Sequence, residues 1–501
     1  MTRPNSLLTV ISFLRRASQL FPDQGVVYGK KMEKYGELYL RVKKISAELK
    51  KIGVRKGDVV GVADWNTLRF FELLYSAAAS GFIIYPVNIR LPPEHIFYTL
   101  KQSDCKWLIA SEDFASIANK SGIPSERIII LRGDDDLAIN LPDEFEGDEV
   151  SGEDPYSILY TSGTTGLPKG VLYTNDRVVM GAMSIVYQLG LFNASAKLTN
   201  EDVIMPLIPF FHLWGWGSPF HAAYLGAKYV VGGKFTVENT IDLIEREGVT
   251  WINAIPTMMY QLLTSSRGEE LKGLKVLIGG SPVPKGLADR MDRLGIKYST
   301  IYGGTDMLAT AIQIKKTDNS IHPVPFVEFK IVTPEGKTAV KGEMGELYVR
   351  APWLPDGYYK DEERSYASFE EGWFRTGDFA KINGDAGIQV LDRVKDVIKS
   401  GGEWIPTSML ESLISEVEGV ASVAVIGIAD QKWGERPVAV IKPEAGKGEK
   451  LVETIKKKLQ DDVGKGKILS WWIPEQFITT DEIPLTSVGK IDKKVLKERY
   501  S

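Results

Sequence analysis

The sequence predicts an α/β protein with a large N-terminal domain of mostly parallel sheets with flanking helices, and a small, mobile α+β C-terminal domain. Three observations support this prediction: the chain length, an alternation of strand and helix patterns over residues 55–310, and two changes of pattern after residue 320. A chain of 501 residues is too long for one hydrophobic core, so two or more domains are expected.

The alternation over residues 55–310 predicts a mostly parallel sheet. Short apolar runs typical of strands occur at 202–208, 227–233, 250–255 and 274–280, and helical patterns follow at 236–249, from Pro256 and at 284–295. Such alternation means crossover connections, and ligands of such sheets bind in loops at the carboxyl ends of the strands. We expect the glycine-rich runs 163–166, 279–280 and 303–304 at such loop positions.

Two further patterns complete the chain. Residues 320–392 alternate apolar and polar residues between turn signals, which predicts a small barrel-like antiparallel subdomain. After it come a helical pattern at 407–419, strand patterns at 420–430 and 436–445, and a lysine-rich helix at 450–460. We therefore expect domain 1–392 to be followed by domain 393–501, which has a size that can fold alone.

Composition excludes several classes of protein. The formal net charge of −4 argues against a general nucleic-acid binder, which needs a basic face. The single cysteine, Cys105, excludes an intrachain disulfide framework and a cysteine-based metal cluster. The four histidines lack the spacing of metal ligands, so no zinc site is expected.

Two apolar segments look like export or membrane signals. Residues 7–14 end at Arg15 and Arg16 without a cleavage site, which favours a first amphipathic helix in this region. Residues 70–89 are interrupted by charge, glycine and proline, which favours a buried helix leading into a buried strand. We expect a cytoplasmic protein with no membrane span.

The segment ILYTSGTTGLPKGVLYTN at 158–175 has the parts of a phosphate-binding loop. Backbone N–H groups in a concave turn, with hydroxyls and a cation nearby, bind polyphosphate. Glycines permit close approach, and Lys169 supplies the charge. The spacing fits neither the Walker nor the dinucleotide pattern. Taken alone, the segment is also compatible with a flexible linker.

Five ordered segments extend this interpretation. They are YTSGTTGLPKG (160–170), YGGTD (302–306), GWFRTGD (372–378), DRVKDVIKSGGEWI (392–405) and PLTSVGKID (484–492). In order and spacing they resemble the motifs of the adenylate-forming superfamily, which includes acyl-CoA synthetases, luciferases and the adenylation domains of peptide synthetases. The hinge segment and QKWGERPVAV resemble the fatty acyl-CoA synthetase branch most.

The resemblance implies an AMP-forming acyl-CoA synthetase that uses MgATP and coenzyme A. Lys490, His212 and Thr305 are the implied catalytic residues, with Thr165 and Asp306 as magnesium ligands. Asp306 replaces the glutamate of the family motif and is one methylene shorter. The implied ATP-binding residues are Thr161, Ser162, Gly163, Thr164, Thr165, Gly166, Lys169, Gly280, Ser281, Tyr302, Gly303, Gly304, Thr305, Asp306, Asp378, Arg393 and Lys490.

The same resemblance implies sites for the other two substrates. Lys395 matches the hinge position, and Lys399, Ser400, Gly401 and Gly402 match the segment that lies along coenzyme A. The implied acyl pocket contains His212, Trp214, Trp216 and Gly303. Trp216 is compatible with a gate of an acyl tunnel and equally with a packed core residue, and His212 is also compatible with a satisfied core histidine.

The absence of a side chain at Gly303 suggests a deep pocket, so we expect a medium-chain fatty acid. A short hydroxy, branched or aryl acid stays open as an alternative. So do the loading of a carrier protein, a luciferase-like oxygenase and a catalytically silent nucleotide-binding regulator. We expect no nucleic-acid partner, and a homodimer is compatible with the sequence.

Overall fold

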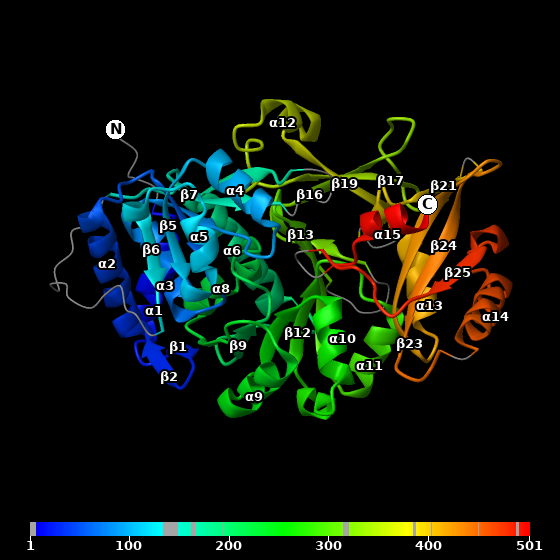
Figure 1. Cartoon of the computed structure of the whole chain (residues 1–501), viewed down its shortest axis with the longest axis horizontal. Helices are drawn as coiled ribbons and strands as arrows, with labels where there is room; N and C mark the ends of the chain where they lie inside the picture. The colour runs from blue at the N-terminus through cyan, green and yellow to red at the C-terminus, as the bar shows by residue number, and fades with distance from the viewer. Residues whose placement is uncertain are drawn as a thin grey trace.

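The computed structural model describes residues 7–133, 149–161, 167–192, 194–313, 320–383, 387–401, 403–448, 450–486 and 490–501. Within these residues the strands form four sheets, and helices pack on them (Figure 1). The predicted α/β class is confirmed, with large N-terminal sheets, a smaller antiparallel sheet and a C-terminal α+β part.

The largest sheet has nine strands in the order β15-β14-β13-β12-β11-β9-β10-β1-β2. The strands from β1 to β13 in this order run parallel, and β2, β14 and β15 pair antiparallel at the edges. The strands are β1 (Gly25–Tyr28), β2 (Lys31–Lys34), β9 (Val203–Pro206), β10 (Lys228–Val231), β11 (Trp251–Ala254), β12 (Lys275–Gly279), β13 (Lys297–Gly304), β14 (Leu308–Ile312) and β15 (His322–Pro323).

The parallel strands of this sheet direct several predicted site segments to one edge. His212 follows β9, Gly280 follows β12 and Thr305 follows β13. Because carboxyl ends of parallel strands meet at one edge, these residues lie where open α/β sheets bind their ligands. Gly303 and Gly304 differ from the expectation, since they are the last two residues of β13 rather than loop residues.

A second sheet has six strands in the order β6-β5-β3-β4-β7-β8. They are β3 (Val59–Ala63), β4 (Ile83–Pro86), β5 (Cys105–Ser111), β6 (Ile128–Leu131), β7 (Pro155–Tyr160) and β8 (Gly170–Thr174). All neighbours are parallel except β7 and β8, which form an antiparallel hairpin. The glycine-rich segment 161–169 therefore connects two strands.

Helix α3 (Leu68–Ser80) is buried against both of these sheets, with contacts to β1 and β4. It is apolar on nearly all sides, as expected for a helix enclosed by the core. The hydroxyl of Thr67 accepts the N–H of Phe70 and so caps its first turn. With β4 after it, α3 confirms the prediction of a buried helix leading into a buried strand.

The other helices of this region cover the faces of the two sheets. They are α1 (Ile11–Leu20), α2 (Tyr35–Ile52), α4 (Pro93–Gln102), α5 (Ala115–Asn119), α6 (Asn175–Leu191), α7 (Leu213–Trp216), α8 (Ser218–Leu225), α9 (Val237–Glu247), α10 (Pro256–Thr264) and α11 (Lys285–Arg293). The first helix begins at Ile11 and includes Arg15, so it lies later than the apolar run 7–14 suggested.

The third sheet is antiparallel and lies in the upper part of the view in Figure 1, between the N-terminal sheets and the C-terminal strands. Its strands are β16 (Glu328–Val332), β17 (Met344–Arg350), β18 (Phe369–Glu370), β19 (Trp373–Ile382) and β20 (Ile388–Arg393), with α12 (Glu362–Ser368) beside them. Asp378 on β19 pairs with Arg393 on β20 in this sheet. The antiparallel pattern predicted for 320–392 is thus observed.

The fourth sheet and its helices form the end of the molecule opposite α1–α5 (Figure 1). It contains β21 (Ile398–Ser400), β22 (Glu403–Ile405), β23 (Val420–Asp430), β24 (Gly434–Pro443) and β25 (Gln476–Thr479). The helices are α13 (Thr407–Ser415), α14 (Leu451–Gly464) and α15 (Lys493–Tyr500). A separate apolar core from Ile398 to Ile468 holds it together.

The C-terminal elements contact the nine-stranded sheet through its helices. Helix α11 packs on α13, where a Cβ at Gly286 would lie 2.1 Å from the carbonyl oxygen of Ser415. Arg290 also pairs with Glu444. Glycine at position 286 is therefore required for this close approach.

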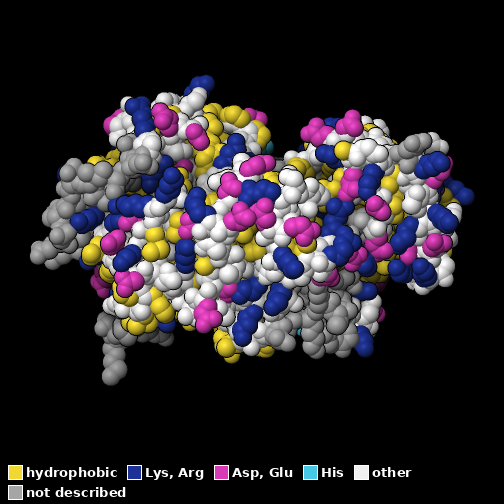
Figure 2. Space-filling view, turned by 90° about the horizontal axis from the view of Figure 1, so that it is seen from below, with side chains coloured by type: hydrophobic (Ala, Val, Ile, Leu, Met, Phe, Trp, Pro, Cys, Tyr) yellow, Lys and Arg dark blue, Asp and Glu magenta, His cyan; other side chains and the backbone are white. Residues whose placement is uncertain are grey.

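Two surface properties bear on the expected partners. On the face shown in Figure 2, cationic and anionic side chains are interspersed, and the described residues there form no continuous basic area. No helix among the described residues is both long and apolar enough to span a membrane.

Candidate active site

One cavity of about 2050 Å³ collects the predicted site residues that the structure describes, except two. It is bounded by the carboxyl ends of the nine-stranded sheet, the third sheet and the C-terminal elements. The predicted residues that line it are Thr161, Lys169, His212, Trp214, Trp216, Gly280, Ser281, Tyr302, Gly303, Gly304, Thr305, Asp306, Asp378, Arg393, Lys395, Lys399 and Lys490.

The ends of the glycine-rich loop are closed by two hydrogen bonds. The N–H of Thr161 donates to the carbonyl oxygen of Lys169 at 2.9 Å. The N–H of Lys169 donates to the hydroxyl of Thr161 at 3.1 Å. The predicted residues between them, Ser162, Gly163, Thr164, Thr165 and Gly166, lie outside the described residues. The hairpin β7–β8 nevertheless brings both ends of this loop to the cavity.

A hydroxyl, a carboxylate and a guanidinium meet on one side of the cavity. The Tyr302 hydroxyl donates to Asp378 at 2.5 Å, and Nε of Arg393 lies 2.9 Å from the other carboxylate oxygen. Burial raises the pKa of Asp378, and the Arg393 charge opposes this shift. Asp378 in turn raises the pKa of Arg393. Adjacent strands β19 and β20 thus keep an anion and a cation together.

Backbone contacts hold this group in place. The N–H of Asp378 donates to the Thr376 hydroxyl at 3.0 Å, and that hydroxyl donates to the Leu347 carbonyl at 2.7 Å. The Tyr173 hydroxyl donates to the Thr305 carbonyl at 2.7 Å. The last contact ties the turn after β13 to strand β8 of the glycine-rich hairpin.

Asp306 has one carboxylate oxygen in a hydrogen bond and one without. The Tyr358 hydroxyl donates to Oδ2 at 3.3 Å, whereas the buried Oδ1 has no partner among the described residues. Burial raises the pKa of Asp306, and the charges of Lys169 and Arg393 oppose the shift. Lys169 lies 4.2 Å from the ring centre of Tyr358, and burial lowers its pKa.

This carboxylate fits one ligand position of a hydrated magnesium ion. No group of three histidine, cysteine or acidic side chains suited to a metal occurs in the described part of the chain. Magnesium does not require such a group, because it commonly keeps several waters and binds one or two carboxylates together with substrate phosphates. The unpaired buried oxygen of Asp306 is a donor of the right kind.

Lys490 enters the cavity from the C-terminal part of the chain. Two hydrogen bonds join Lys490 to Thr486. The N–H of Thr486 donates to the carbonyl oxygen of Lys490 at 2.6 Å, and the N–H of Lys490 donates to the hydroxyl of Thr486 at 3.2 Å. Its Cε lies 3.2 Å from where a Cβ of Gly280 would be. Burial and the nearby Arg393 charge lower the pKa of Lys490 to about 8. Gly280 thus leaves room for the lysine to approach Arg393 and Asp378.

His212 lies half-buried at the start of α7, close enough to Lys490 to interact electrostatically. Burial, with the Lys490 and Arg90 charges, lowers its pKa to about 3, so the imidazole is neutral. After it, Leu213 to Gly217 all have positive φ between 45° and 72°, which makes one turn of left-handed helix. Such a turn costs energy for each residue with a side chain, so it persists because the surrounding structure holds it in place.

The two predicted tryptophans of this turn differ in environment. Trp214 is buried among the rings of Tyr156, Tyr173 and Phe220, and its indole N–H donates to the Ser157 hydroxyl at 3.2 Å. Trp216 is only partly buried, and its ring lies 3.1 Å from where a Cβ of Gly279 would be. Trp214 is therefore mainly a core residue, whereas Trp216 lines the cavity and packs against β12.

The structure explains the glycine at position 303 by a close backbone contact, and not by the space for an acyl chain that the sequence suggested. A Cβ at this position would lie 2.1 Å from the carbonyl oxygen of Leu308 and 2.7 Å from Cα of Ala309. Strand β14 thus occupies the space next to it. Glycine is required here by the β13–β14 pairing, and its presence alone does not indicate a deep acyl pocket.

The predicted coenzyme A segment lies mostly apart from the cavity. Lys399 lines it, but Ser400 and Gly401 do not. Ser400 is buried and accepts a hydrogen bond from Arg436 at 3.1 Å, and Gly401, with φ +61°, packs on Trp433. Gly402 lies outside the described residues. In this structure Lys490 lines the cavity, whereas Ser400 and Gly401 of the predicted coenzyme A segment do not.

Many of the lining residues were not predicted from the sequence, among them Tyr358, Thr376, Leu308 and His221. Thr376 lies inside the GWFRTGD segment, so its motif offered a signal. The other three lie outside the recognised motifs. Only the three-dimensional pairing of distant segments brings them to the cavity.

Comparisons with known proteins agree with this geometry. The profile of the AMP-binding enzyme family matches residues 14–359, and that of the AMP-binding enzyme C-terminal domain matches residues 409–490. The chain belongs to the AMP-binding enzyme family. The resemblance to adenylate-forming enzymes is confirmed, and with it the expected enzyme class, an AMP-forming acid–thiol ligase.

Members of this family with similar sequences act on different acids. A long-chain-fatty-acid–CoA ligase of Thermus thermophilus is 30% identical, with 98% of this chain and 96% of the relative covered. A 3-methylmercaptopropionyl-CoA ligase of Ruegeria lacuscaerulensis is also 30% identical, with 93% and 91% covered. Among solved structures, the anthranilate CoA ligase AuaEII in complex with anthranoyl-AMP superposes with a TM-score of 0.91 at 22% identity. The superposition covers 99% of this chain and 98% of that chain, which shows that the two proteins share a fold.

Proposed function

We propose that this enzyme activates a medium-chain carboxylic acid with MgATP and transfers the acyl group to coenzyme A. The observation that carries the proposal is the meeting of Lys490 with Tyr302, Asp378 and Arg393 in one cavity. A cation at that place is suited to an α-phosphate, and the tyrosine and carboxylate are suited to an adenosine. The acids named for the two relatives differ widely in length, so the chain length in this proposal rests on the apolar cavity wall and the family resemblance.

The first half-reaction activates the carboxylate. Its oxygen attacks the α-phosphorus of ATP, pyrophosphate leaves, and an acyl-adenylate forms. In this proposal Tyr302 stacks on the adenine, Asp378 accepts the ribose hydroxyls, and Arg393 and Thr305 contact the nucleotide. Lys490 neutralises charge that develops on the phosphoryl and carboxylate oxygens, and neutral His212 lies beside the acyl carboxylate.

The phosphate end of ATP is assigned to the glycine-rich loop. Residues 161–166 would surround the β- and γ-phosphates with N–H groups and hydroxyls, and Lys169 would supply a positive charge. Asp306 and Thr165 would hold magnesium, which screens the negative charge of the phosphates. The unpaired Oδ1 of Asp306 supports this assignment.

The second half-reaction transfers the acyl group to a thiol. We propose that domain 393–501 rotates about Lys395 relative to domain 1–392, withdraws Lys490 and brings Lys399, Ser400, Gly401 and Gly402 to coenzyme A. The thiol then attacks the acyl carbon, and AMP leaves. The position of Ser400 and Gly401 outside the cavity supports such a movement. The proposed location of the reaction is the cytoplasm.

The test is acid-dependent exchange of pyrophosphate into ATP, with AMP release measured with and without coenzyme A. A panel of acids from two to sixteen carbons, with aryl acids, covers the alternatives. We expect exchange with medium-length acids, and AMP turnover only when coenzyme A is present. Absence of exchange with every acid would contradict the proposal, and AMP turnover without coenzyme A would favour an oxygenase.

A further inference from the structure

His221 is a buried polar side chain in the wall of the cavity. It lies on α8 and is 2% exposed. Its Nδ1 has no hydrogen-bond partner among the described residues. Buried polar atoms in proteins are normally paired, so an exception needs a reason.

The surrounding wall is apolar. Helices α6 and α8 pack together, and the described cavity residues between positions 175 and 225 include no lysine, arginine, aspartate or glutamate. These residues, apart from His212 and His221, are Val178, Gly181, Ala182, Ile185, Leu213, Trp214, Trp216, Gly217 and Phe220. Burial lowers the pKa of His221 to about 3. The imidazole is therefore neutral and has one donor and one acceptor to offer.

The backbone beside His221 is shaped to accept its ring. Gly217 ends the left-handed turn with φ +72°, and a Cβ there would lie 3.0 Å from Nε2 of His221. Gly217 also lines the cavity. Any side chain at 217 would press on the imidazole, so the glycine leaves room for the ring at the cavity wall.

His212 and His221 stand on either side of the left-handed turn. His212 is near Lys490, where the carboxyl group of the acid is assigned. His221 follows the end of the turn and faces the same cavity on a wall without charged residues. The two histidines thus offer separate contacts along one acyl pocket.

We propose that His221 hydrogen-bonds a neutral polar group, such as a hydroxyl, carbonyl or ether oxygen, carried by the acid away from its carboxyl. This inference rests on the proposed function and specifies its substrate class. A plain alkanoate leaves the imidazole unpaired, which disfavours binding. A second carboxylate is also disfavoured, because a charge in this wall would find no cation.

The test compares acids of equal length in pyrophosphate exchange. One is unsubstituted, others carry one hydroxyl or oxo group at successive carbons, and one is the dicarboxylic acid. We expect the best hydroxy or oxo acid to exceed the plain acid in kcat/KM by about tenfold or more, and the dicarboxylic acid to be poorest.

Two variants assign this preference to His221. We expect His221→Leu to lower the ratio of kcat/KM for the substituted and plain acids by about 10- to 100-fold, and His221→Gln to keep part of it. Ile185→Val changes the same wall without a polar atom and should leave the ratio unchanged. Thermal unfolding of each variant shows whether it is folded.

Three results would overturn the inference. The first is a ratio of kcat/KM for the substituted and plain acids that is near one in the unaltered enzyme. The second is a ratio that His221→Leu does not change, which is the result expected if only water pairs the imidazole. The third is a preference for the plain acid or for the dicarboxylic acid. Exchange with the plain acid alone rejects this inference and leaves the proposed function standing. Exchange with no acid rejects both.

Discussion

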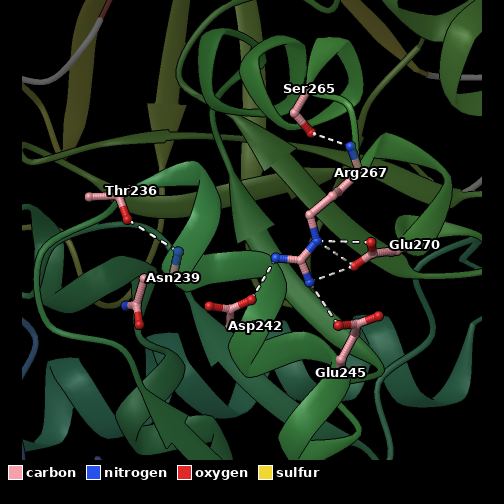
Figure 3. A network of polar contacts seen from close by, with 7 residues as sticks. All are labelled: Thr236, Asn239, Asp242, Glu245, Ser265, Arg267 and Glu270. Atoms are coloured by element: carbon pink, nitrogen blue, oxygen red, sulfur yellow. Dashed lines mark hydrogen bonds and ion pairs between the residues drawn. The ribbon is translucent and has the colours of Figure 1, made fainter.

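Arg267 and Lys490 are both cationic side chains, but only Arg267 forms ion pairs with described residues. The side chain of Arg267 is partly exposed and contacts Asp242 at 2.5 Å, Glu245 at 2.7 Å and Glu270 at 2.8 Å. Figure 3 shows these three contacts. Lys490 is enclosed in the cavity and has no ion pair with any described residue. The guanidinium of Arg267 is therefore paired within the protein, whereas the ammonium group of the half-buried Lys490 is not.

The difference separates residues that stabilise the fold from residues prepared for a ligand. The Arg267 contacts join α9 to the helical turn Gly268–Leu271 and need nothing further (Figure 3). In the cavity, the Oδ1 atom of Asp306 and the Nδ1 atom of His221 lack partners among the described residues. Because an unpaired buried polar group destabilises a protein, we expect a ligand to pair these two groups of the cavity.

The largest effect is expected for Lys490→Ala. It removes the charge assigned to the phosphoryl transition state, so the rate of pyrophosphate exchange should fall by about 10²–10³-fold. The exposed Lys494→Ala is the matched control and should retain the rate. An equal loss in both variants, or none in Lys490→Ala, would contradict the assigned role.

A slightly smaller and more selective effect is expected for Lys395→Pro. Proline restricts the backbone at the assigned hinge, so thioester formation should fall by at least about 10²-fold while exchange is kept. Rapid-quench measurement of each half-reaction distinguishes them. Equal losses in both half-reactions would reject a hinge at this position.

A moderate effect is expected for Asp306→Asn. Loss of the negative charge should raise the magnesium concentration for half-maximal exchange by about tenfold or more. Asp306→Glu restores the carboxylate of the family motif and should remain close to the unaltered enzyme. An unchanged magnesium dependence in Asp306→Asn would place the metal elsewhere.

The smallest effect is expected for Arg267→Ala. Exposed ion pairs contribute little to stability and are screened by salt. We expect a small decrease in the melting temperature, which shrinks at high salt, and unchanged exchange. A large loss of exchange in a folded Arg267→Ala protein would show that the two regions are coupled.

The sequence predicted those parts of the site that local motifs define. Motifs far apart in the chain led to Tyr302, Asp378, Arg393 and Lys490, and the structure brings all four to one cavity. Most strands and helices between residues 200 and 300 were also predicted, because strict alternation of apolar runs leaves few other arrangements.

Features that depend on tertiary pairing were not predicted. The hairpin after the glycine-rich loop requires β8 to pair with β7, and nothing in residues 161–170 specifies that partner. Position 303 requires glycine because a Cβ there would collide with the carbonyl oxygen of Leu308 on the next strand, β14. The left-handed turn at 213–217 could not be predicted from residue preferences, because leucine and tryptophan rarely adopt positive φ. Tyr358 meets Asp306 only through the folded chain.

The most direct test of a charged Lys490 in the first half-reaction is the pH dependence of kcat/KM for ATP in pyrophosphate exchange. This parameter reports the pKa of the free enzyme. Since burial and Arg393 lower the pKa of Lys490 to about 8 and the protonated form is required, kcat/KM should fall as the pH rises through about 8. In Lys490→Arg, the fall should move to much higher pH, because a guanidinium stays charged. A profile that stays flat to pH 9.5, or the same fall in Lys490→Arg, would contradict the account.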